Sequence, residues 1–136
     1  MNIKKLSTFV LTMAFFFGVS FEAASHHSFV GQYDPDISRV LTGTVSGVRW
    51  VNPHAFFVIN VSNDNGTTES WTFELGSPNT LIRYGWNRDT LEIGDIISVD
   101  GYLARSGENL VNAKIVTLAD GTVIQAGSSY DLEETR

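Results

Sequence analysis

Apolar and polar side chains alternate with a period of two through much of the chain after residue 38, which is typical of half-buried β-strands. Two segments, 54–62 and 68–75, each place their apolar side chains on one face: Ala55, Phe57, Ile59 and Val61, and Trp71, Phe73 and Leu75. Between them lies Asn65-Gly66, a dipeptide that favours a tight hairpin turn. The pattern therefore predicts two antiparallel strands joined by a hairpin.

Four further segments have strand character between turn residues: 39–50, 96–104, 110–118 and 122–126. Asn52-Pro53 ends the first of these, because proline fixes φ and has no N–H to donate to a ladder. A short helix is predicted over residues 78–84. There Ser77 can cap the helix, Pro78 suits its first position and Gly85 is placed to end it.

The predicted order is three strands, a short helix, and two or three more strands (βββαββ). We therefore expect an all-β domain with one short helix, folded as a small OB-like β-barrel of five to six strands, in which the helix covers one end. Gly43 and Gly47 fit this, since the first strand of such a barrel must bend sharply. An open β-sandwich built from the same hairpins is the alternative.

The N-terminus has a different pattern. Lys4 and Lys5 precede a charge-free apolar run, residues 6–21, and small residues follow at 23–25. This predicts a cleavable signal peptide, because the run is shorter than the roughly 20 apolar residues of a membrane-spanning helix. An uncleaved N-terminal anchor is the alternative. The chain contains no cysteine, which excludes lipid attachment after the run.

We therefore predict four parts of the chain: a signal peptide (1–25), an N-terminal arm (26–38), the barrel domain (39–127) and a polar C-terminal tail (128–136). The protein would be periplasmic or secreted, with no stable membrane insertion after cleavage. The exported part has seven basic and fourteen acidic side chains, a net charge of −7. This charge repels phosphate backbones, so nucleic acid is not an expected partner, whereas cations are favoured.

The three histidines provide a candidate metal site. His26 and His27 follow the predicted cleavage site directly, so cleavage places a free α-amine beside two imidazoles. Nitrogen-rich sites of this kind select Cu(II) or Ni(II). His54, after the Asn-Pro break, would join them if the arm packs against that end of the barrel. The alternative is a loose arm and an ordinary polar residue at the start of a strand.

A second candidate site lies around the helix. Glu74 and Arg83, with Trp86 nearby, could bind a small polar ligand. The same residues could equally tie the helix to the barrel. No glycine-rich phosphate loop, nucleophile elbow or paired-histidine zinc helix is present, so a non-enzymatic role is expected.

Several sequence blocks resemble a family of exported bacterial proteins of unknown function: His26-His27-Ser28-Phe29, Gly43-Thr44-Val45, Asn52-Pro53-His54-Ala55, Glu74-Leu75-Gly76-Ser77-Pro78-Asn79, Gly85-Trp86 and Gly94-Asp95. The resemblance covers nearly all of the mature chain. It implies a bacterial origin and a periplasmic location, and it brings no established activity or catalytic residue. A looser resemblance is to small periplasmic OB-type barrels.

The leading hypothesis is a non-enzymatic binding module for Cu(II) or another divalent cation, held by His26, His27 and His54. Two alternatives come from other classes of protein. One is an accessory protein that binds an unknown periplasmic partner through the barrel face. The other is a small-ligand carrier or enzyme that uses Glu74 and Arg83.

Overall fold

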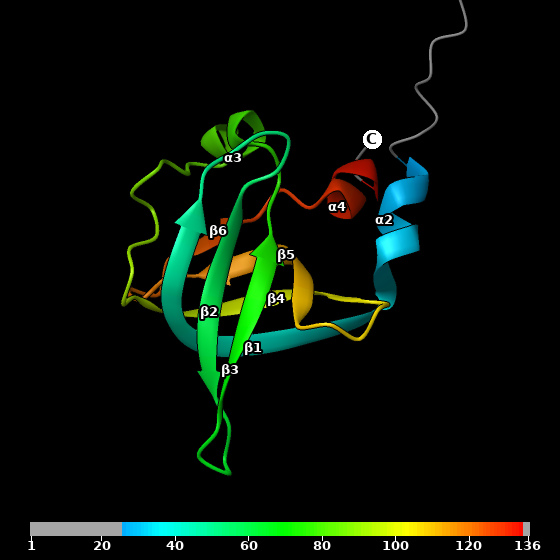
Figure 1. The fold of residues 1–136 in the computed structure, drawn as a ribbon. Helices are drawn as coiled ribbons and strands as arrows, with labels where there is room; N and C mark the ends of the chain where they lie inside the picture. The colour runs from blue at the N-terminus through cyan, green and yellow to red at the C-terminus, as the bar shows by residue number, and fades with distance from the viewer. Residues whose placement is uncertain (1–25, 135–136) are drawn as a thin grey trace, which may run out of the picture.

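The computed structural model describes residues 26–134, with side chains from Phe29 to Leu132. The elements run in the order α2 (His26–Gln32), β1 (Tyr33–Arg49), β2 (Phe56–Ser62), β3 (Thr68–Glu74), α3 (Pro78–Arg83), β4 (Ile96–Ala104), β5 (Leu110–Thr117), β6 (Val123–Gln125) and α4 (Ser129–Glu134) (Figure 1). The predicted signal peptide lies outside the described residues. None of the helices that are described is long and apolar enough to cross a membrane.

The sheet closes on itself. The strand order is β3-β2-β1-β4-β5-β6, and β3 also pairs with β5, so strands β1 to β5 form a barrel. β3 and β5 run parallel, with residues 72–74 opposite residues 110–112, whereas the other neighbours are antiparallel. With a helix between β3 and β4, this is an OB-type arrangement. The predicted fold class is confirmed, and the β3–β5 pairing excludes an open sandwich.

β1 serves both sides of the barrel. Its residues 33–44 pair with β4, and its residues 44–49 pair with β2. The register with β2 shifts between Val45 and Gly47, and such a bulge bends the strand. At Gly43 a Cβ would lie 2.4 Å from the carbonyl oxygen of Asn60, so only glycine lets the two strands approach this closely.

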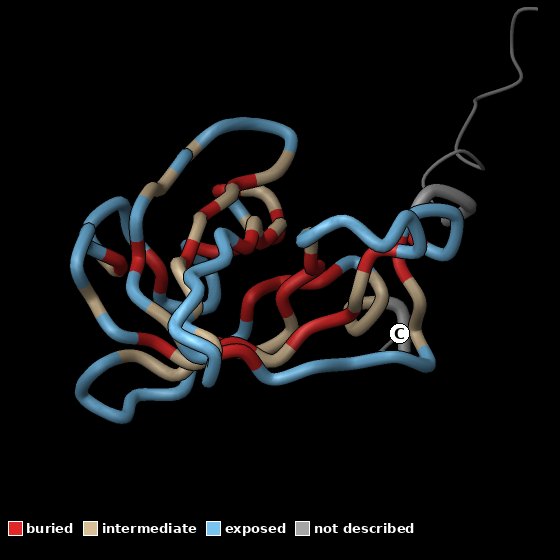
Figure 2. Tube along the Cα trace, turned by 60° about the horizontal axis from the view of Figure 1, so that its bottom comes forward, coloured by how far each residue is buried: buried red, intermediate tan, exposed pale blue. Residues whose placement is uncertain are grey.

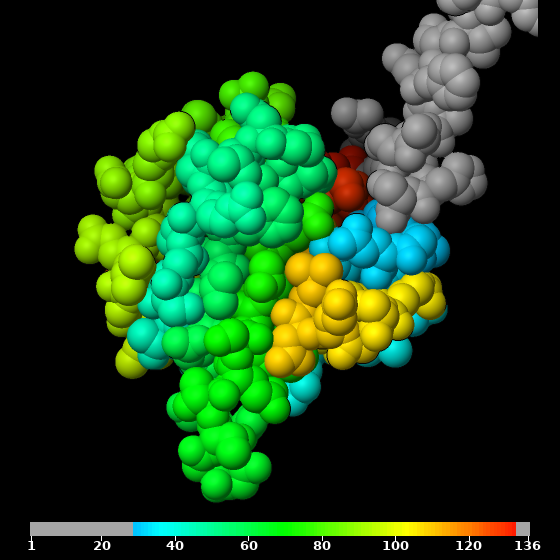
Figure 3. All heavy atoms as spheres, viewed as in Figure 1, coloured from blue at the N-terminus to red at the C-terminus, as the bar shows by residue number. Residues whose placement is uncertain are grey.

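The β2–β3 hairpin extends beyond the barrel (Figures 1 and 3). The amide of Asn63 donates to the carbonyl of Thr67 across the turn, at 2.8 Å. Residues 68–70 of β3 have β2 on one side and no strand on the other, because the pairing with β5 begins only at residue 72. These three residues are polar and exposed.

The barrel interior is filled by the apolar faces that alternation predicted, including Phe57, which stacks on Phe73 with ring centroids 4.9 Å apart. α3 adds Leu81, which is completely buried in the same core. The helix begins and ends as the sequence predicts. The Ser77 hydroxyl accepts from the amide of Thr80, and Gly85 has φ +92°.

A second apolar cluster lies outside the barrel, on the outer surface of β4 and β5. It consists of Phe29, Tyr33, Tyr102 and Ala104, with Leu110 and Tyr130 packed against them. Figure 2 shows buried positions extending outward from the barrel along one side of the molecule. We call these six residues the outer aromatic cluster.

The outer aromatic cluster explains two differences from the sequence prediction. Residues 26–38 were predicted to form an arm, but they form α2 and the beginning of β1. Residues 128–136 were predicted to form a loose tail, but α4 occupies 129–134. Both helices form because each contributes an aromatic ring to the cluster: Phe29 lies 5.1 Å from Tyr130, centroid to centroid.

We expect Phe29→Ala to reduce the free energy of unfolding by about 3 kcal/mol, because a buried aromatic ring with three ring partners is lost. Denaturation monitored by circular dichroism measures this change. Val30→Ala is the matched control, since Val30 is adjacent but exposed, and it should change stability by less than about 0.5 kcal/mol. Equal effects of the two substitutions would contradict the packing of α2 described above.

Candidate functional site

A polar cluster lies where the start of β1, the end of β3 and the β1–β2 loop meet. The hydroxyl of Tyr33 donates to Oε2 of Glu74 at 2.5 Å. The other carboxylate oxygen of Glu74, Oε1, lies 3.2 Å from Nδ1 of His54. We call these three residues the Tyr33–Glu74–His54 cluster. It joins three segments that are far apart in the sequence through one carboxylate.

Backbone pairing places His54 beside Glu74. The β2–β3 ladder continues past the formal end of both strands, since Leu75 donates to Ala55 at 2.8 Å and Ala55 donates to Gly76 at 3.2 Å. His54 therefore lies opposite the end of β3. Glu74 faces away from the barrel because its neighbours Phe73 and Leu75 face the core, and side chains alternate along a strand.

The neighbours of His54 determine its neutral tautomer. Its Nδ1 lies 3.1 Å from the carbonyl oxygen of Leu75 as well as close to the carboxylate of Glu74. Both neighbours are hydrogen-bond acceptors, so Nδ1 must carry the proton. The neutral ring then has its lone pair on Nε2. Since 40% of the His54 side chain is exposed, a ligand can approach the ring from solvent.

Tyr33 holds Glu74 from the buried side. Only 2% of Tyr33 is exposed. Burial raises the pKa of its phenol far above the ordinary value of 10.0, and the hydrogen bond and negative charge of Glu74 raise it further. The phenol therefore stays protonated and donates to Glu74 throughout the physiological range.

A buried amide lies next to this cluster. Asn112 on β5 is directly opposite Glu74 in the parallel pairing, and both face outward, since their preceding neighbours Val111 and Phe73 are in the barrel core. Asn112 is 2% exposed, and its Oδ1 accepts no hydrogen bond from the described residues. The outer surface of β3 and β5 thus holds two adjacent polar groups, Glu74 and Asn112.

Arg105, which the sequence analysis did not single out, fastens α2 to the barrel. From the β4–β5 turn its Nε donates to the carbonyl oxygens of Val30 at 2.8 Å and Tyr33 at 3.1 Å, and its Nη1 forms an ion pair with Asp34 at 3.0 Å. Figure 3 shows α2 lying against this turn. A single arginine in a loop carries no sequence signal for such a role, because its partners are about seventy residues away.

The structure places the predicted metal ligands as follows. His26 and His27 are the first two residues of α2, and their side chains are outside the described part. His54 lies in the Tyr33–Glu74–His54 cluster. Among the residues whose side chains are described, no group of three or more histidine, aspartate and glutamate side chains converges on one point. The predicted convergence of the three histidines therefore stays a prediction.

Among the described residues, Glu74 and Arg83 of the predicted ligand site around α3 do not form an ion pair with each other. Both oxygens of Glu74 are engaged by Tyr33 and His54, while Nε of Arg83 donates to the carbonyl of Asn79 within its own helix, at 3.3 Å. Trp86 is only 3% exposed and belongs to the barrel core, where its indole donates to the carbonyl of Gln125. Trp86 thus ties the segment after α3 to β6, whereas the hydrogen bond of Arg83 stays within α3. Ligand binding by Glu74, Arg83 and Trp86 stays a prediction.

The closed strand order and the outward-facing cluster define a small OB-type barrel with a polar site outside its core. The chain belongs to a family of unknown function, DUF6152, whose profile matches residues 15–112. This confirms the resemblance drawn from the sequence blocks.

Among solved structures, the mitochondrial single-stranded DNA-binding protein Rim1 of S. cerevisiae is similar to this chain. The two are 12% identical with a TM-score of 0.48, and the match covers 60% of this chain and 92% of that one. No curated protein sequence matches the chain. The OB-type assignment rests on the strand order described above.

The raised pKa of Tyr33 makes stability depend on alkaline pH. Above pH 10 the unfolded chain loses the Tyr33 proton while the folded protein keeps it, so the contribution is complete below pH 10 and is lost as pH rises. We expect the free energy of unfolding to fall by about 1.4 kcal/mol per pH unit from this group. In Tyr33→Phe, this contribution to the change of the free energy of unfolding with pH should disappear.

Urea denaturation between pH 9 and 11 measures the slope, with the pH range set by the ordinary tyrosine pKa of about 10. Tyr84→Phe is the control, because Tyr84 is exposed and its removal should leave the slope as it is in the parent protein. An unchanged slope in Tyr33→Phe would show that the phenol is not held protonated by the fold.

Proposed function

We propose that this protein is an exported, non-enzymatic binding module for Cu(II) or a similar divalent cation, with His54 as a ligand through Nε2. His26 and His27, with the α-amine freed by cleavage, supply the remaining ligands. The observation that carries the proposal is the orientation of His54, whose Nδ1 donates to Glu74 and to the carbonyl of Leu75.

Metal-binding histidines characteristically donate their second ring nitrogen to a carboxylate or a backbone carbonyl. Such a partner fixes the tautomer, orients the ring and makes the ligating nitrogen more basic. His54 has both kinds of partner at one nitrogen. Glu74 is itself held by Tyr33, so the imidazole is positioned before any ligand arrives. In this proposal Glu74 orients His54 and is not itself a ligand.

The anchoring of α2 supports participation of the N-terminal histidines. Tyr33, directly after α2, contacts the same carboxylate as His54. His26 precedes Tyr33 by seven residues, a separation of about 10 Å along a helix at 1.5 Å per residue. We propose that the histidines at this end of α2 join His54 in holding the ion.

The chemistry of the chain favours a cation bound by nitrogen ligands. It has no cysteine, so a thiolate site is excluded, and its formal net charge is −6 over the whole sequence. Imidazole and amine nitrogens suit Cu(II) and Ni(II). A negatively charged surface also raises the local concentration of cations.

The test is calorimetric titration of Cu(II) into protein purified from the periplasm, so that the N-terminus is processed. We expect one ion per chain, and we expect His54→Ala to bind it at least about tenfold more weakly through loss of a ligand. Electron paramagnetic resonance reports the loss of one nitrogen from the copper coordination. Unchanged affinity and spectrum in His54→Ala would mean that the N-terminus chelates copper alone, and would end the proposal of a built site.

The orienting role of Glu74 predicts a separate effect. Glu74→Gln keeps the size of the side chain but removes the charge behind the imidazole, and we expect the affinity for Cu(II) to fall about 10-fold or more. Glu69→Gln is the matched control, because Glu69 is on the same strand but exposed at its far end, and it should bind as the parent does. If the two variants bind alike, Glu74 has no part in the site.

A further inference from the structure

A groove of about 360 Å³ lies on the barrel where the end of β1, β2 and β3 run side by side (Figure 1). Its volume is at the small end of the range for ligand sites, about 300–1,000 Å³. The residues that line it are apolar or glycine, apart from Arg49 and Thr72. The groove is therefore an apolar site with a single charged residue.

Side-chain alternation and one missing side chain produce this groove. Phe57 and Ile59 face the barrel core. Their neighbours Phe56 and Val58 therefore face outward, where they form the apolar surface of the groove. On β1 the residue paired with Val58 is Gly47, and a Cβ there would meet no heavy atom within 4 Å. The space beside Val58 is consequently open.

Arg49 supplies the positive charge of the groove. It is paired with Phe56 across β1 and β2, and its guanidinium carbon lies 5.9 Å from the centroid of the Phe56 ring. This cation–π contact orients the guanidinium and occupies none of its N–H donors. Among the residues that the structure describes, none forms an ion pair or a hydrogen bond with the Arg49 guanidinium. Its donors are therefore available to a ligand.

The charges around the groove favour an anion at Arg49. The sequence has 15 acidic and 9 basic side chains, so carboxylates are in excess, yet no described one pairs with Arg49. Glu74 lies in the same cross-strand row, on the far side of Phe56. Two strand spacings separate it from Arg49, about 10 Å, and its oxygens are engaged by Tyr33 and His54. A negatively charged group beside Arg49 is thus two strands away from Glu74.

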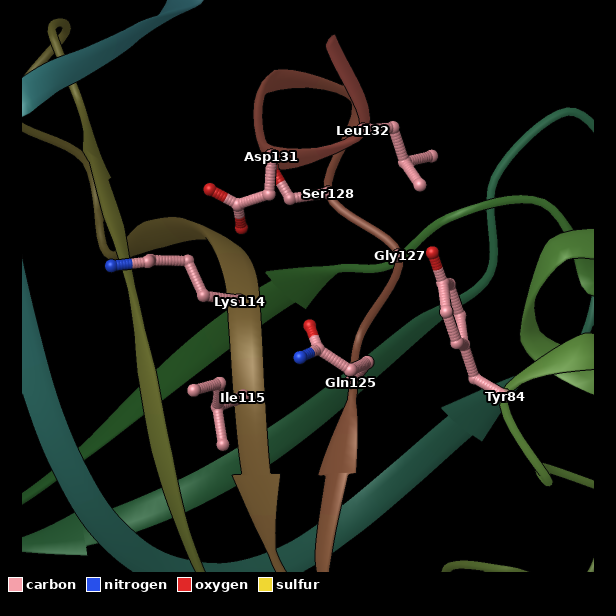
Figure 4. Close-up of a pocket in the computed structure, with 8 residues that line it drawn as sticks. All are labelled: Tyr84, Lys114, Ile115, Gln125, Gly127, Ser128, Asp131 and Leu132. Atoms are coloured by element: carbon pink, nitrogen blue, oxygen red, sulfur yellow. The ribbon is translucent and has the colours of Figure 1, made fainter. Parts of the chain in front are cut away.

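A second cavity shows no such preference for one charge. It has a volume of about 370 Å³ and lies between β5, the β6–α4 connection and α4 (Figure 4). Lys114 and Asp131 both line it, so an anion and a cation would each meet a like charge there. Lys114 also forms an ion pair with Asp100, at 3.6 Å. The groove beside Arg49 is therefore the better candidate for a charged ligand.

We propose that this groove binds a small organic monocarboxylate with a short apolar chain, whose carboxylate pairs with Arg49 and whose chain lies against Phe56 and Val58. A guanidinium binds a carboxylate through two parallel hydrogen bonds, and the apolar surface removes the chain from water. None of the ligands proposed for copper lines the groove. The inference is therefore additional to the copper site and does not rest on it.

The experiment is a titration of the processed, metal-free, ¹⁵N-labelled protein with sodium octanoate at millimolar concentrations, followed by amide chemical shifts. We expect saturable shifts centred on residues 47–49, 56–58 and 72. Acetate has the charge without the chain, and 1-octanol has the chain without the charge. Each should bind at least about tenfold more weakly than octanoate, because each lacks one of the two interactions.

Two variants separate the contributions of charge and space. Arg49→Gln removes the charge, and we expect about tenfold weaker binding of octanoate with no change for 1-octanol. Arg88→Gln is the matched control, because Arg88 is also exposed but lies outside the groove, and it should bind octanoate as the parent does. Gly47→Val fills the groove without a clash or a positive φ, so it should fold and lose binding of both ligands.

Far-ultraviolet circular dichroism checks that the variants are folded, and the comparison of Arg49→Gln with Arg88→Gln is decisive if Gly47→Val is not. The proposal is overturned if octanoate gives no saturable shifts at these residues, or if acetate or 1-octanol binds as tightly as octanoate. It is equally overturned if the two arginine variants bind octanoate alike, or if folded Gly47→Val binds it as the parent does.

Discussion

The structure depends on a single strand that belongs to both sides of the barrel. β1 pairs with β4 through its first part and with β2 through its last six residues. It can do so only because it bends at the bulge between Val45 and Gly47 and because Gly43 leaves room for the carbonyl of Asn60. The bend brings β3 alongside β5, and their short parallel pairing closes the barrel. That closure places Glu74 opposite Asn112 on the outer surface of the barrel.

Closure has a direct consequence for the candidate site. The end of β3 lies beside β5, and its Glu74 faces outward and accepts a hydrogen bond from Tyr33 at the start of β1. Glu74 therefore lies between two environments, the buried phenol of Tyr33 and the half-exposed imidazole of His54. The outer aromatic cluster keeps Tyr33 in place, and Arg105 holds the backbone on either side of it. The orientation of His54 therefore depends on the packing of the outer aromatic cluster as well as on the barrel.

The sequence was sufficient for the features that depend on neighbouring residues. Alternation identified the buried faces of β2 and β3, and Ser77, Pro78 and Gly85 defined α3. The sequence was insufficient where the partners are far apart in the chain. Phe29 and Tyr130 are single aromatic residues in polar segments, and no local pattern shows that they stack on each other. The same holds for Glu74, whose contact with Tyr33 spans 41 residues. The histidines were recognisable as metal ligands by type, but the tautomer of His54 could be assigned only once Leu75 and Glu74 were placed around it.

The projecting tip of the β2–β3 hairpin, residues 62–70, contributes no side chain to either core. The edge of β3 that has no strand beside it carries Thr68, Glu69 and Ser70, and a charged, polar edge discourages a second chain from adding to the sheet. Because the turn at residues 63–67 is bonded within itself and touches neither helix α2 nor α4, extra length there would leave the rest of the fold in place. The hairpin tip is accordingly the natural point at which to attach a fluorophore or a fusion partner while the surface around His54 remains accessible.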